Sequence, residues 1–320
     1  MVTSRVSRRT SIAGMTGAVA SAALPRRARA ETAPLRIALV PIWDVAPYYA
    51  AEQQGYFTAE NIAVTQQIVR GGAAAIPALV GGSFDMVYAN GTSIVTAITK
   101  GIDLRIILEG APIGSGPPDP GALLKRKGEP LKTGKDLEGK IVGVNALRDV
   151  QWMFVTAWIK ETGGDPDKVQ IIEVPLPSMV DTLKAKRVDA ALVLDPFMTM
   201  GLADPAIELL DWALSRVYAG GPVGFFTITP ELAARRPNDV RAFMRAYKRG
   251  AAWVNANTGK EPFIKLIAGF TGITPELVGQ MKPVPAHADI VPSGLSHLTA
   301  LMTQTGLLTT SVDLRTKIFS

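Results

Sequence analysis

The chain has 320 residues and contains no cysteine. Without cysteine there can be no disulfide, no thiolate nucleophile, no zinc site built on thiolates and no lipid-bearing cysteine. Histidine is almost as scarce, because the chain has only His287 and His297. Neither histidine has carboxylate or sulfur ligands at metal-binding spacing. We therefore expect neither a metal site nor a cofactor.

Common catalytic and nucleotide-binding motifs are also missing. No serine lies in a Gly-x-Ser-x-Gly elbow, and no glycine-rich loop is followed by Lys-Ser or Lys-Thr. Gly114-Ser115-Gly116 is followed by prolines, so it cannot open a helix as a dinucleotide-binding loop does. We therefore expect a protein that is not an enzyme.

The first thirty residues lack acidic side chains and resemble an export signal. The run 11–24 is apolar but too short to span a bilayer, and Ala28-Arg29-Ala30 has the small residues of a signal-peptidase site. Ser7-Arg8-Arg9-Thr10 resembles a twin-arginine signal. We predict a signal peptide over residues 1–30, cleaved near Ala30, and a soluble periplasmic protein. Twin-arginine (Tat) export and the ordinary secretory route both remain open.

Arginines of this leader account for the net charge of the chain. They number six, as many as the formal net charge of +6, so the processed protein is close to neutral. No broad basic patch then remains, and we expect no nucleic-acid partner. The six are Arg5, Arg8, Arg9, Arg26, Arg27 and Arg29.

A shift of 104 residues superposes two halves of the chain without a gap. Residues 36–40 then fall on 140–144, and 79–87 fall on 183–191. Each half reads as strand, helix, strand, helix, strand. We predict an α/β protein of two lobes with a ligand cleft between them, because small ligands bind preferentially between such lobes. The expected strands are 35–40, 62–69, 85–89 and 104–108 in the first lobe, and 122–125, 141–144, 169–174, 190–194 and 207–210 in the second.

Proline and glycine clusters divide the chain further. We expect the first lobe over residues 31–115, the second over 116–222, and a helical part over 223–320 that returns to the first lobe. Hinges are expected near Gly110–Gly121 and Gly220–Gly224. From Thr229 onward the chain is expected to be helical, with helix starts at Thr229 and Thr274, each followed by proline.

Two further helix starts and a helix end are predicted from local signals. Asp44 precedes a helix that ends at Gly55, and Ser178 with Asp181 is similar to a capping box. Apolar residues at helical spacing, including Phe243, Tyr247 and Val254, are expected in the core.

Ligands of open α/β sheets bind at the loops that follow the carboxyl ends of the strands. Several of these loops open helices, whose positive ends favour a small anion. Arg148 either grips a carboxylate or sulfonate, or lies on the surface, or pairs with Asp149. Asp44 fits a helix cap better than a ligand contact, and the aromatic residues form either pocket walls or core. The candidate ligand-binding residues are Trp43, Asp44, Tyr48, Gly72, Asn90, Thr92, Asn145, Arg148, Asp195 and Phe197.

Three segments resemble ABC-transporter substrate-binding proteins of the nitrate/sulfonate/taurine type. They are residues 46–57 (APYYAAEQQGYF), 136–144 (DLEGKIVGV) and 186–192 (KRVDAAL), the last followed by Asp195-Pro196. The resemblance implies a type II periplasmic binding protein fold with a discontinuous first lobe. It also implies a receptor that delivers a small organic anion to an ABC permease in the inner membrane. We expect the receptor to act as a monomer.

The same superfamily contains thiamine-pyrimidine synthases, menaquinone-pathway enzymes and an aromatic desulfinase. The desulfinase needs a nucleophilic cysteine and the pyrimidine synthases carry a cysteine-rich motif, and this chain has neither. An enzyme acting on a pyrimidine or aromatic substrate, and a receptor for a neutral pyrimidine precursor, remain alternatives. Arg148 favours a sulfonate or carboxylate over these ligands and over nitrate.

Overall fold

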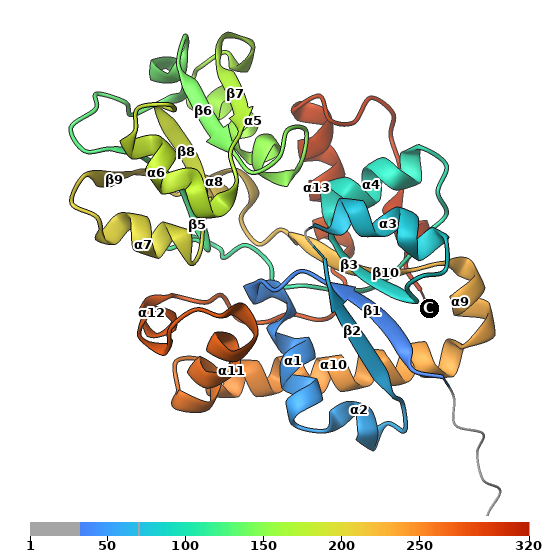
Figure 1. The fold of residues 1–320 in the computed structure, drawn as a ribbon. Helices are drawn as coiled ribbons and strands as arrows, with labels where there is room; N and C mark the ends of the chain where they lie inside the picture. The colour runs from blue at the N-terminus through green and yellow to red at the C-terminus, as the bar shows by residue number, and fades with distance from the viewer. Residues whose placement is uncertain (1–32, 70, 320) are drawn as a thin grey trace, which may run out of the picture. The chain divides into compact units, whose positions relative to one another are not determined.

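The computed structural model describes residues 33–69 and 71–319 (Figure 1). The predicted signal peptide, its cleavage near Ala30 and its arginine pair lie outside the described residues. Within the described residues two five-stranded sheets are each covered by helices, which confirms the two-lobed α/β architecture.

The first sheet has the strand order β2-β1-β3-β10-β4. Strand β1 pairs in parallel with β2 and β3, whereas β10 is antiparallel to both β3 and β4. The strands are β1 (Leu35–Leu39), β2 (Val64–Ile68), β3 (Met86–Asn90), β4 (Arg105–Glu109) and β10 (Gly224–Ile228). The helices between them are α1 (Ala46–Gln53), α2 (Tyr56–Ala59), α3 (Gly72–Val80) and α4 (Gly91–Thr99).

The second sheet has the order β7-β6-β8-β5-β9. Here β6 pairs in parallel with β7 and β8, and β5 is antiparallel to β8 and β9. The strands are β5 (Gly121–Arg126), β6 (Ile141–Val144), β7 (Gln170–Glu173), β8 (Ala190–Leu194) and β9 (Ile207–Asp211). The helices are α5 (Val150–Glu161), α6 (Met179–Lys184), α7 (Phe197–Ala203) and α8 (Ala213–Tyr218).

The two sheets have one topology, so the repeat seen in the sequence is a repeat of structure. Strands β2, β1 and β3 correspond to β7, β6 and β8, and the first residues of β3 and β8, Met86 and Ala190, are 104 positions apart. The antiparallel strand of each sheet is the one on which the chain changes lobes. Strand β5 brings it into the second lobe, and β10 returns it to the first.

Strand β10 was not predicted. From the sequence we expect a hinge near Gly220–Gly224 and helices from Thr229 onward, with no strand between them. The segment Gly-Phe-Phe-Thr-Ile does not alternate, because all five of its residues are buried in the middle of a sheet. A short apolar run of this kind carries no periodicity from which a strand can be recognised.

Two crossing segments, residues 110–120 and 219–223, join the lobes and lie against each other. The amide of Gly110 donates to the carbonyl of Gly224 at 2.9 Å, and that of Ile113 donates to the carbonyl of Gly221 at 2.9 Å. The predicted hinge regions are therefore neighbours in the fold.

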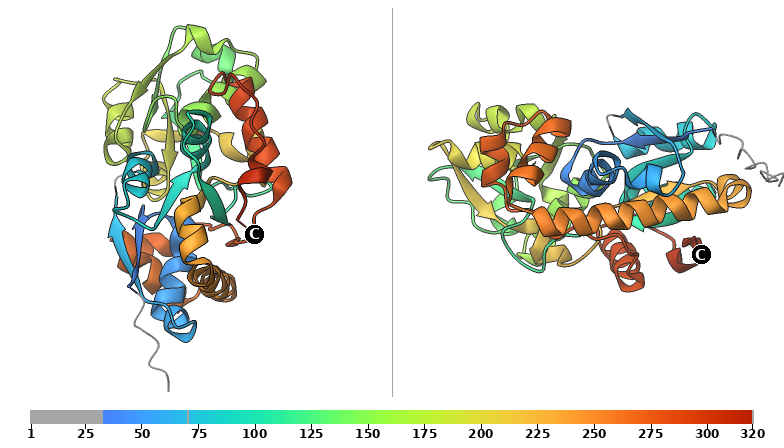
Figure 2. Two further views of the ribbon diagram at one scale, coloured as in Figure 1. Left: turned by 90° about the vertical axis from the view of Figure 1, so that its right-hand side faces the viewer. Right: turned by 90° about the horizontal axis from the view of Figure 1, so that it is seen from below.

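The C-terminal helices cover the first lobe. Helix α10 (Pro237–Asn257) packs on α1 (Figure 1), and its predicted core residues Phe243, Tyr247 and Val254 are buried. Figure 2 shows from below how α10 runs along this lobe. The remaining elements are α9 (Pro230–Arg235), α11 (Glu261–Thr271), α12 (Pro275–Gln280), α13 (Pro292–Gln304) and a final 3-10 turn (Leu314–Lys317).

Local helix signals were right at three positions and wrong at two. Thr229 and Thr274 accept bonds from the amides of Leu232 and Leu277, and Gly55 ends α1 with a φ of 68°. Asp44 is not a cap, because it lies inside a 3-10 turn (Trp43–Val45) and Val45 precedes α1. Ser178 makes no cap bond either, since its backbone is already helical, with φ −98° and ψ −3°, whereas a capping residue is extended.

No helix within residues 33–69 and 71–319 is both long and apolar enough to cross a membrane.

Candidate functional site

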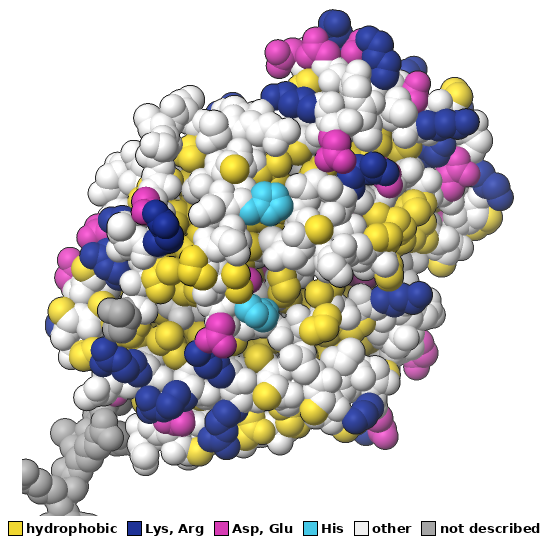
Figure 3. All heavy atoms as spheres, turned by 180° about the vertical axis from the view of Figure 1, so that it is seen from behind, with side chains coloured by type: hydrophobic (Ala, Val, Ile, Leu, Met, Phe, Trp, Pro, Cys, Tyr) yellow, Lys and Arg dark blue, Asp and Glu magenta, His cyan; other side chains and the backbone are white. Residues whose placement is uncertain are grey.

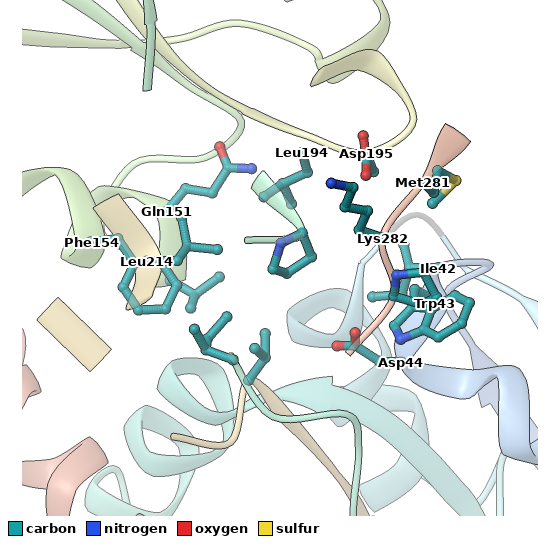
Figure 4. A pocket seen from close by; sticks show the side chains of 15 residues that line it. Ile42, Trp43, Asp44, Gln151, Phe154, Leu194, Asp195, Leu214, Met281 and Lys282 are labelled. Atoms are coloured by element: carbon teal, nitrogen blue, oxygen red, sulfur yellow. The ribbon is translucent and has the colours of Figure 1, made fainter. Parts of the chain in front are cut away.

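A pocket lies where the loops that follow strands of both sheets meet (Figure 4). Ile42, Trp43 and Asp44 follow β1, while Leu194 and Asp195 come from the end of β8. The cavity volume is about 90 Å³. Because one water needs about 10–15 Å³ of such volume, the pocket has room for roughly six to nine water-sized groups. It is sized for a small molecule or for one end of a larger molecule.

The walls of this inner pocket are mostly apolar. They include Ile113 and Pro120 from one crossing segment, Val223 from the other, and Phe154 and Leu214 from α5 and α8. In such a setting the few polar groups determine which ligand can bind.

Asp44 is one of two carboxylates in the inner pocket. Its Oδ2 accepts a 2.8 Å hydrogen bond from the hydroxyl of Tyr88. No cationic side chain among the described residues forms an ion pair with it. Burial raises the pKa of Asp44 to about 6, and the bond from Tyr88 partly offsets that effect. At neutral pH Asp44 is therefore a mostly ionised carboxylate that forms no ion pair with any described side chain.

Asp195 is the second carboxylate. Its Oδ1 accepts bonds from the amide of Thr199 at 3.0 Å and from the hydroxyl of Thr199 at 2.7 Å. Burial raises its pKa as well, against the effect of those two bonds. The two bonds hold the carboxylate at the start of α7.

Hydrogen-bond donors complete the polar lining. The Oε1 of Gln151 accepts from the amide of Asn145 at 2.8 Å, which leaves the buried Nε2 without a partner among the described residues. The buried Nε1 of Trp43 also has no partner there. In Figure 4 the Gln151 amide nitrogen and the Lys282 ammonium point toward the middle of the pocket from opposite sides. These groups can donate to an acceptor or an anionic group on a ligand.

The structure brings some of the predicted residues together. Trp43, Asp44 and Asp195 line the inner pocket, and Phe197 lines an adjoining hollow. Asn145 contributes its backbone amide, which holds Gln151 in place. Tyr48 belongs to the core, where it is fully buried and its ring lies 5.3 Å from that of Phe57. Gly72 is the first residue of α3.

Asn90 and Thr92 bind a protein carboxylate. The side chain of Asn90 donates to Asp149 Oδ2 at 3.1 Å, and the hydroxyl of Thr92 lies 2.6 Å from Asp149 Oδ1. Asp149 also accepts from the amide of Val150 at the start of α5. This group, which we term the Asp149 clasp (Asn90, Thr92, Asp149), links the helix start after β3 to the helix start after β6.

Arg148 does not line the inner pocket. Its φ of 53° places it in the left-handed region, and its Nη2 donates to the carbonyl of Gly306 at 3.2 Å. Its guanidinium also lies 5.7 Å from the ring centroid of Trp152. The side chain borders a different hollow, beside α4. The 104-residue shift places Arg148 opposite Asp44, but Asp44 lines the inner pocket and Arg148 does not, because the backbone of Arg148 is left-handed.

Other pocket residues were not found from the sequence. Gln151 is the second residue of α5, directly after the loop that follows β6, so the strand-end rule pointed close to its position. Met281 and Lys282 follow α12 and no strand, so that rule could not find them. Only the return of the C-terminal helices brings them to the pocket.

The two histidines lie apart. Figure 3 shows two separate histidine side chains on the face opposite to that of Figure 1. Within the described part of the chain, no three His, Cys, Asp or Glu side chains gather as a metal site would require.

Known structures have this fold. The Escherichia coli aliphatic sulphonate binding protein SsuA superposes with a TM-score of 0.75 at 17% identity, over 89% of this chain and 97% of that one. The nitrate-binding protein NrtA from Synechocystis PCC 6803 gives 0.72 at 14% identity, over 88% and 84%. The desulfurization enzyme DSZB gives 0.62 at 15% identity, over 89% and 96%.

The sequence of the chain matches a known family. No curated protein matches the chain. The sequence profile described as NMT1/THI5 like matches residues 43–260, more than half of the chain. That range begins in the loop after β1 and runs past the second crossing segment. The resemblance to binding proteins of the nitrate/sulfonate/taurine type is confirmed, and the chain belongs to the NMT1/THI5-like family.

Proposed function

We propose that the chain is the substrate-binding component of an ABC importer. It binds a small organic molecule between its lobes in the periplasm, as a monomer, and delivers it to a permease in the inner membrane. The observation that carries this proposal is the inner pocket, which strand-end loops of both lobes build around unpaired polar groups. The sulfonate-binding and nitrate-binding proteins of the same fold support it.

The ligand carries an amino group. Asp44 and Asp195 form no ion pair with a described side chain, and an ammonium or another N–H donor on the ligand would compensate them. A purely anionic ligand could pair with Lys282 but would leave Asp44 and Asp195 uncompensated, which is unfavourable in a poorly solvated pocket.

The same ligand carries an acidic or acceptor group. Lys282, the free Nε2 of Gln151 and the Nε1 of Trp43 all donate. The organic acid expected from the sequence is thus retained, with these residues in place of Arg148. An amino-substituted carboxylate or sulfonate satisfies both sets of groups. An aminopyrimidine is the runner-up, since its ring nitrogens accept while its amino group donates.

Paired probes test the ligand class. Taurine, β-alanine and 4-aminobenzoate are compared by calorimetry with ethanesulfonate, propionate and benzoate, and 4-aminopyrimidine is added. We expect the amino members to bind more tightly, and Asp44→Asn or Asp195→Asn to weaken them about thirtyfold or more. Asp204→Asn, at a surface ion pair in the second lobe, is the control. Tighter binding of the analogues without an amino group would contradict the proposal.

One further variant and one assay separate the alternatives. Lys282→Met should weaken the binding of amino acids and aminosulfonates. If the true ligand class is an aminopyrimidine, the affinity for 4-aminopyrimidine should be unchanged in this variant. A receptor returns its ligand intact, whereas an enzyme consumes it, so mass spectrometry after prolonged incubation distinguishes the two. Turnover of a bound probe would overturn the receptor assignment.

A further inference from the structure

The inner pocket adjoins a second and larger hollow, which we term the trough. Its cavity volume is about 490 Å³, and it shares Ile42, Trp43, Asp195 and Met281 with the inner pocket. Phe197 and Met200 of α7 form one wall, and Ile273 and Leu277, at the start of α12, form the other. The walls therefore come from the second lobe and from the helices that cover the first.

Apart from the residues that it shares with the inner pocket, the trough has a mostly apolar lining. Asp195 is the one ionisable side chain among the described residues that line it, and Asp195 is shared with the inner pocket. Its two threonine hydroxyls are engaged by their own helices. Thr271 donates to the carbonyl of Ile267 at 2.6 Å, and the hydroxyl oxygen of Thr274 accepts from the amide of Leu277. Met200, by contrast, is 54% exposed although it is apolar.

We infer that the trough is a second subsite, which receives an apolar extension of the ligand whose polar head binds in the inner pocket. The inference rests on the proposed function. The shared lining identifies the occupant, because a molecule anchored at Asp44 and Gln151 that outgrows the small inner pocket meets the trough at Trp43 and Met281. A charged tail would find no partner there, whereas an alkyl or aryl tail gains free energy by covering Phe197, Met200 and Leu277.

The expected ligand is thus amphipathic, with a polar head and an apolar tail of several carbons. Since the tail contacts both α7 and α12, it adds contacts between the lobes that a short ligand cannot make. Long ligands should therefore bind more tightly and also favour lobe closure more strongly.

A chain-length series tests the subsite. The probes are linear 2-aminoalkanoic acids from alanine to 2-aminodecanoate, with n-alkylamines and n-alkanesulfonates of the same lengths. We expect the dissociation constant measured by calorimetry to fall about fourfold for each added methylene until the trough is filled. Met200→Gln should reduce the gain in affinity for each added methylene. The matched control is Leu202→Gln, on the same helix, whose side chain is exposed and does not line the trough.

The outcomes separate this inference from the proposed function. If alkylamines or alkanesulfonates gain affinity with length while the amino acids do not, the trough stands and the proposed head group is wrong. If no series gains affinity with length, or no member of any series binds, the subsite is overturned. Equal effects of Met200→Gln and Leu202→Gln also overturn it. Unchanged binding with lost uptake in cells carrying Met200→Gln would instead assign this surface to the permease.

Discussion

The hydroxyl of Tyr88 donates to the carboxylate of Asp44 at 2.8 Å, while the same tyrosine lies against Gly110, at the start of one crossing segment, and Gly224, at the start of β10. A side-chain carbon on either Gly110 or Gly224 would collide with the Tyr88 hydroxyl. One side chain thus contacts a carboxylate of the inner pocket and a glycine in each of the two predicted hinge regions.

Tyr88→Phe removes the bond that favours ionised Asp44, so the pKa of Asp44 should rise above its present value of about 6. An amino ligand needs the ionised form, and its affinity falls as the pH drops through that pKa. We expect the loss of affinity to begin at a higher pH in the variant, as measured by calorimetry between pH 5 and 8. Tyr218→Phe is the control, because its hydroxyl makes only a 3.4 Å contact with the carbonyl of Gly294. Identical pH profiles of Tyr88→Phe and the wild type would refute this role.

Arg148→Ala should leave ligand affinity within about twofold of wild type, since its guanidinium is bound to Gly306 outside the inner pocket. A loss of thirtyfold or more would restore the sequence-based assignment of Arg148 as the anion grip. Its left-handed backbone gives a second readout. Arg148→Gly should be more stable than Arg148→Ala by about 1 kcal/mol, because a Cβ is disfavoured at a φ of 53°. Denaturant unfolding of the two variants measures the difference.

Thr92→Val deletes the shortest bond of the Asp149 clasp while keeping the shape of the side chain. The Asp149 carboxylate then loses a donor, and we expect the unliganded lobes to separate more often. Small-angle scattering should show a larger radius of gyration, and unfolding should become easier by about 1–3 kcal/mol. Thr156→Val is the matched control. The buried hydroxyl of Thr156 has no partner among the described residues, so its removal should be neutral or stabilising. Equal effects of the two substitutions would argue against the clasp.

Glu109, at the end of β4, should make folding dependent on pH. Burial raises its pKa to about 7, although the amide of Val291 donates to it at 3.2 Å. The folded protein therefore holds this proton more tightly than the unfolded chain. The stabilisation is complete below pH 4.5 or so and is lost as the pH rises to about 7, by roughly 3 kcal/mol in all. Two titratable side chains face it, namely His287, whose Nδ1 lies 3.6 Å away, and Asp289.

Glu109→Gln should abolish this contribution, so the variant should gain stability relative to the wild type as the pH is raised from 5 to 8. Denaturant unfolding at several pH values measures it, with Glu161→Gln on the surface as the control. A constant difference between Glu109→Gln and wild type across that range would disprove the role of this carboxyl.

The sequence by itself determined the features that depend on local pattern and on spacing. Alternating and periodic apolar residues placed nine of the ten strands, and the 104-residue offset predicted two sheets of one topology. Thr229 and Thr274 as helix starts, and Gly55 as a helix end, follow from the backbone preferences of single residues. The rule for strand ends was sufficient to place Trp43, Asp44 and Asp195 at the pocket.

Only the tertiary structure decided which side chains meet there. Lys282 reaches the pocket because the C-terminal helices return to the first lobe, and Arg148 misses it because its backbone is left-handed. Asp149 occupies the donors of Asn90 and Thr92 because two helix starts in different lobes face each other. Strand β10 is formed by pairing with β3 on one side and β4 on the other. Each of these features depends on residues that are far away in the chain, so it cannot be predicted from the local sequence.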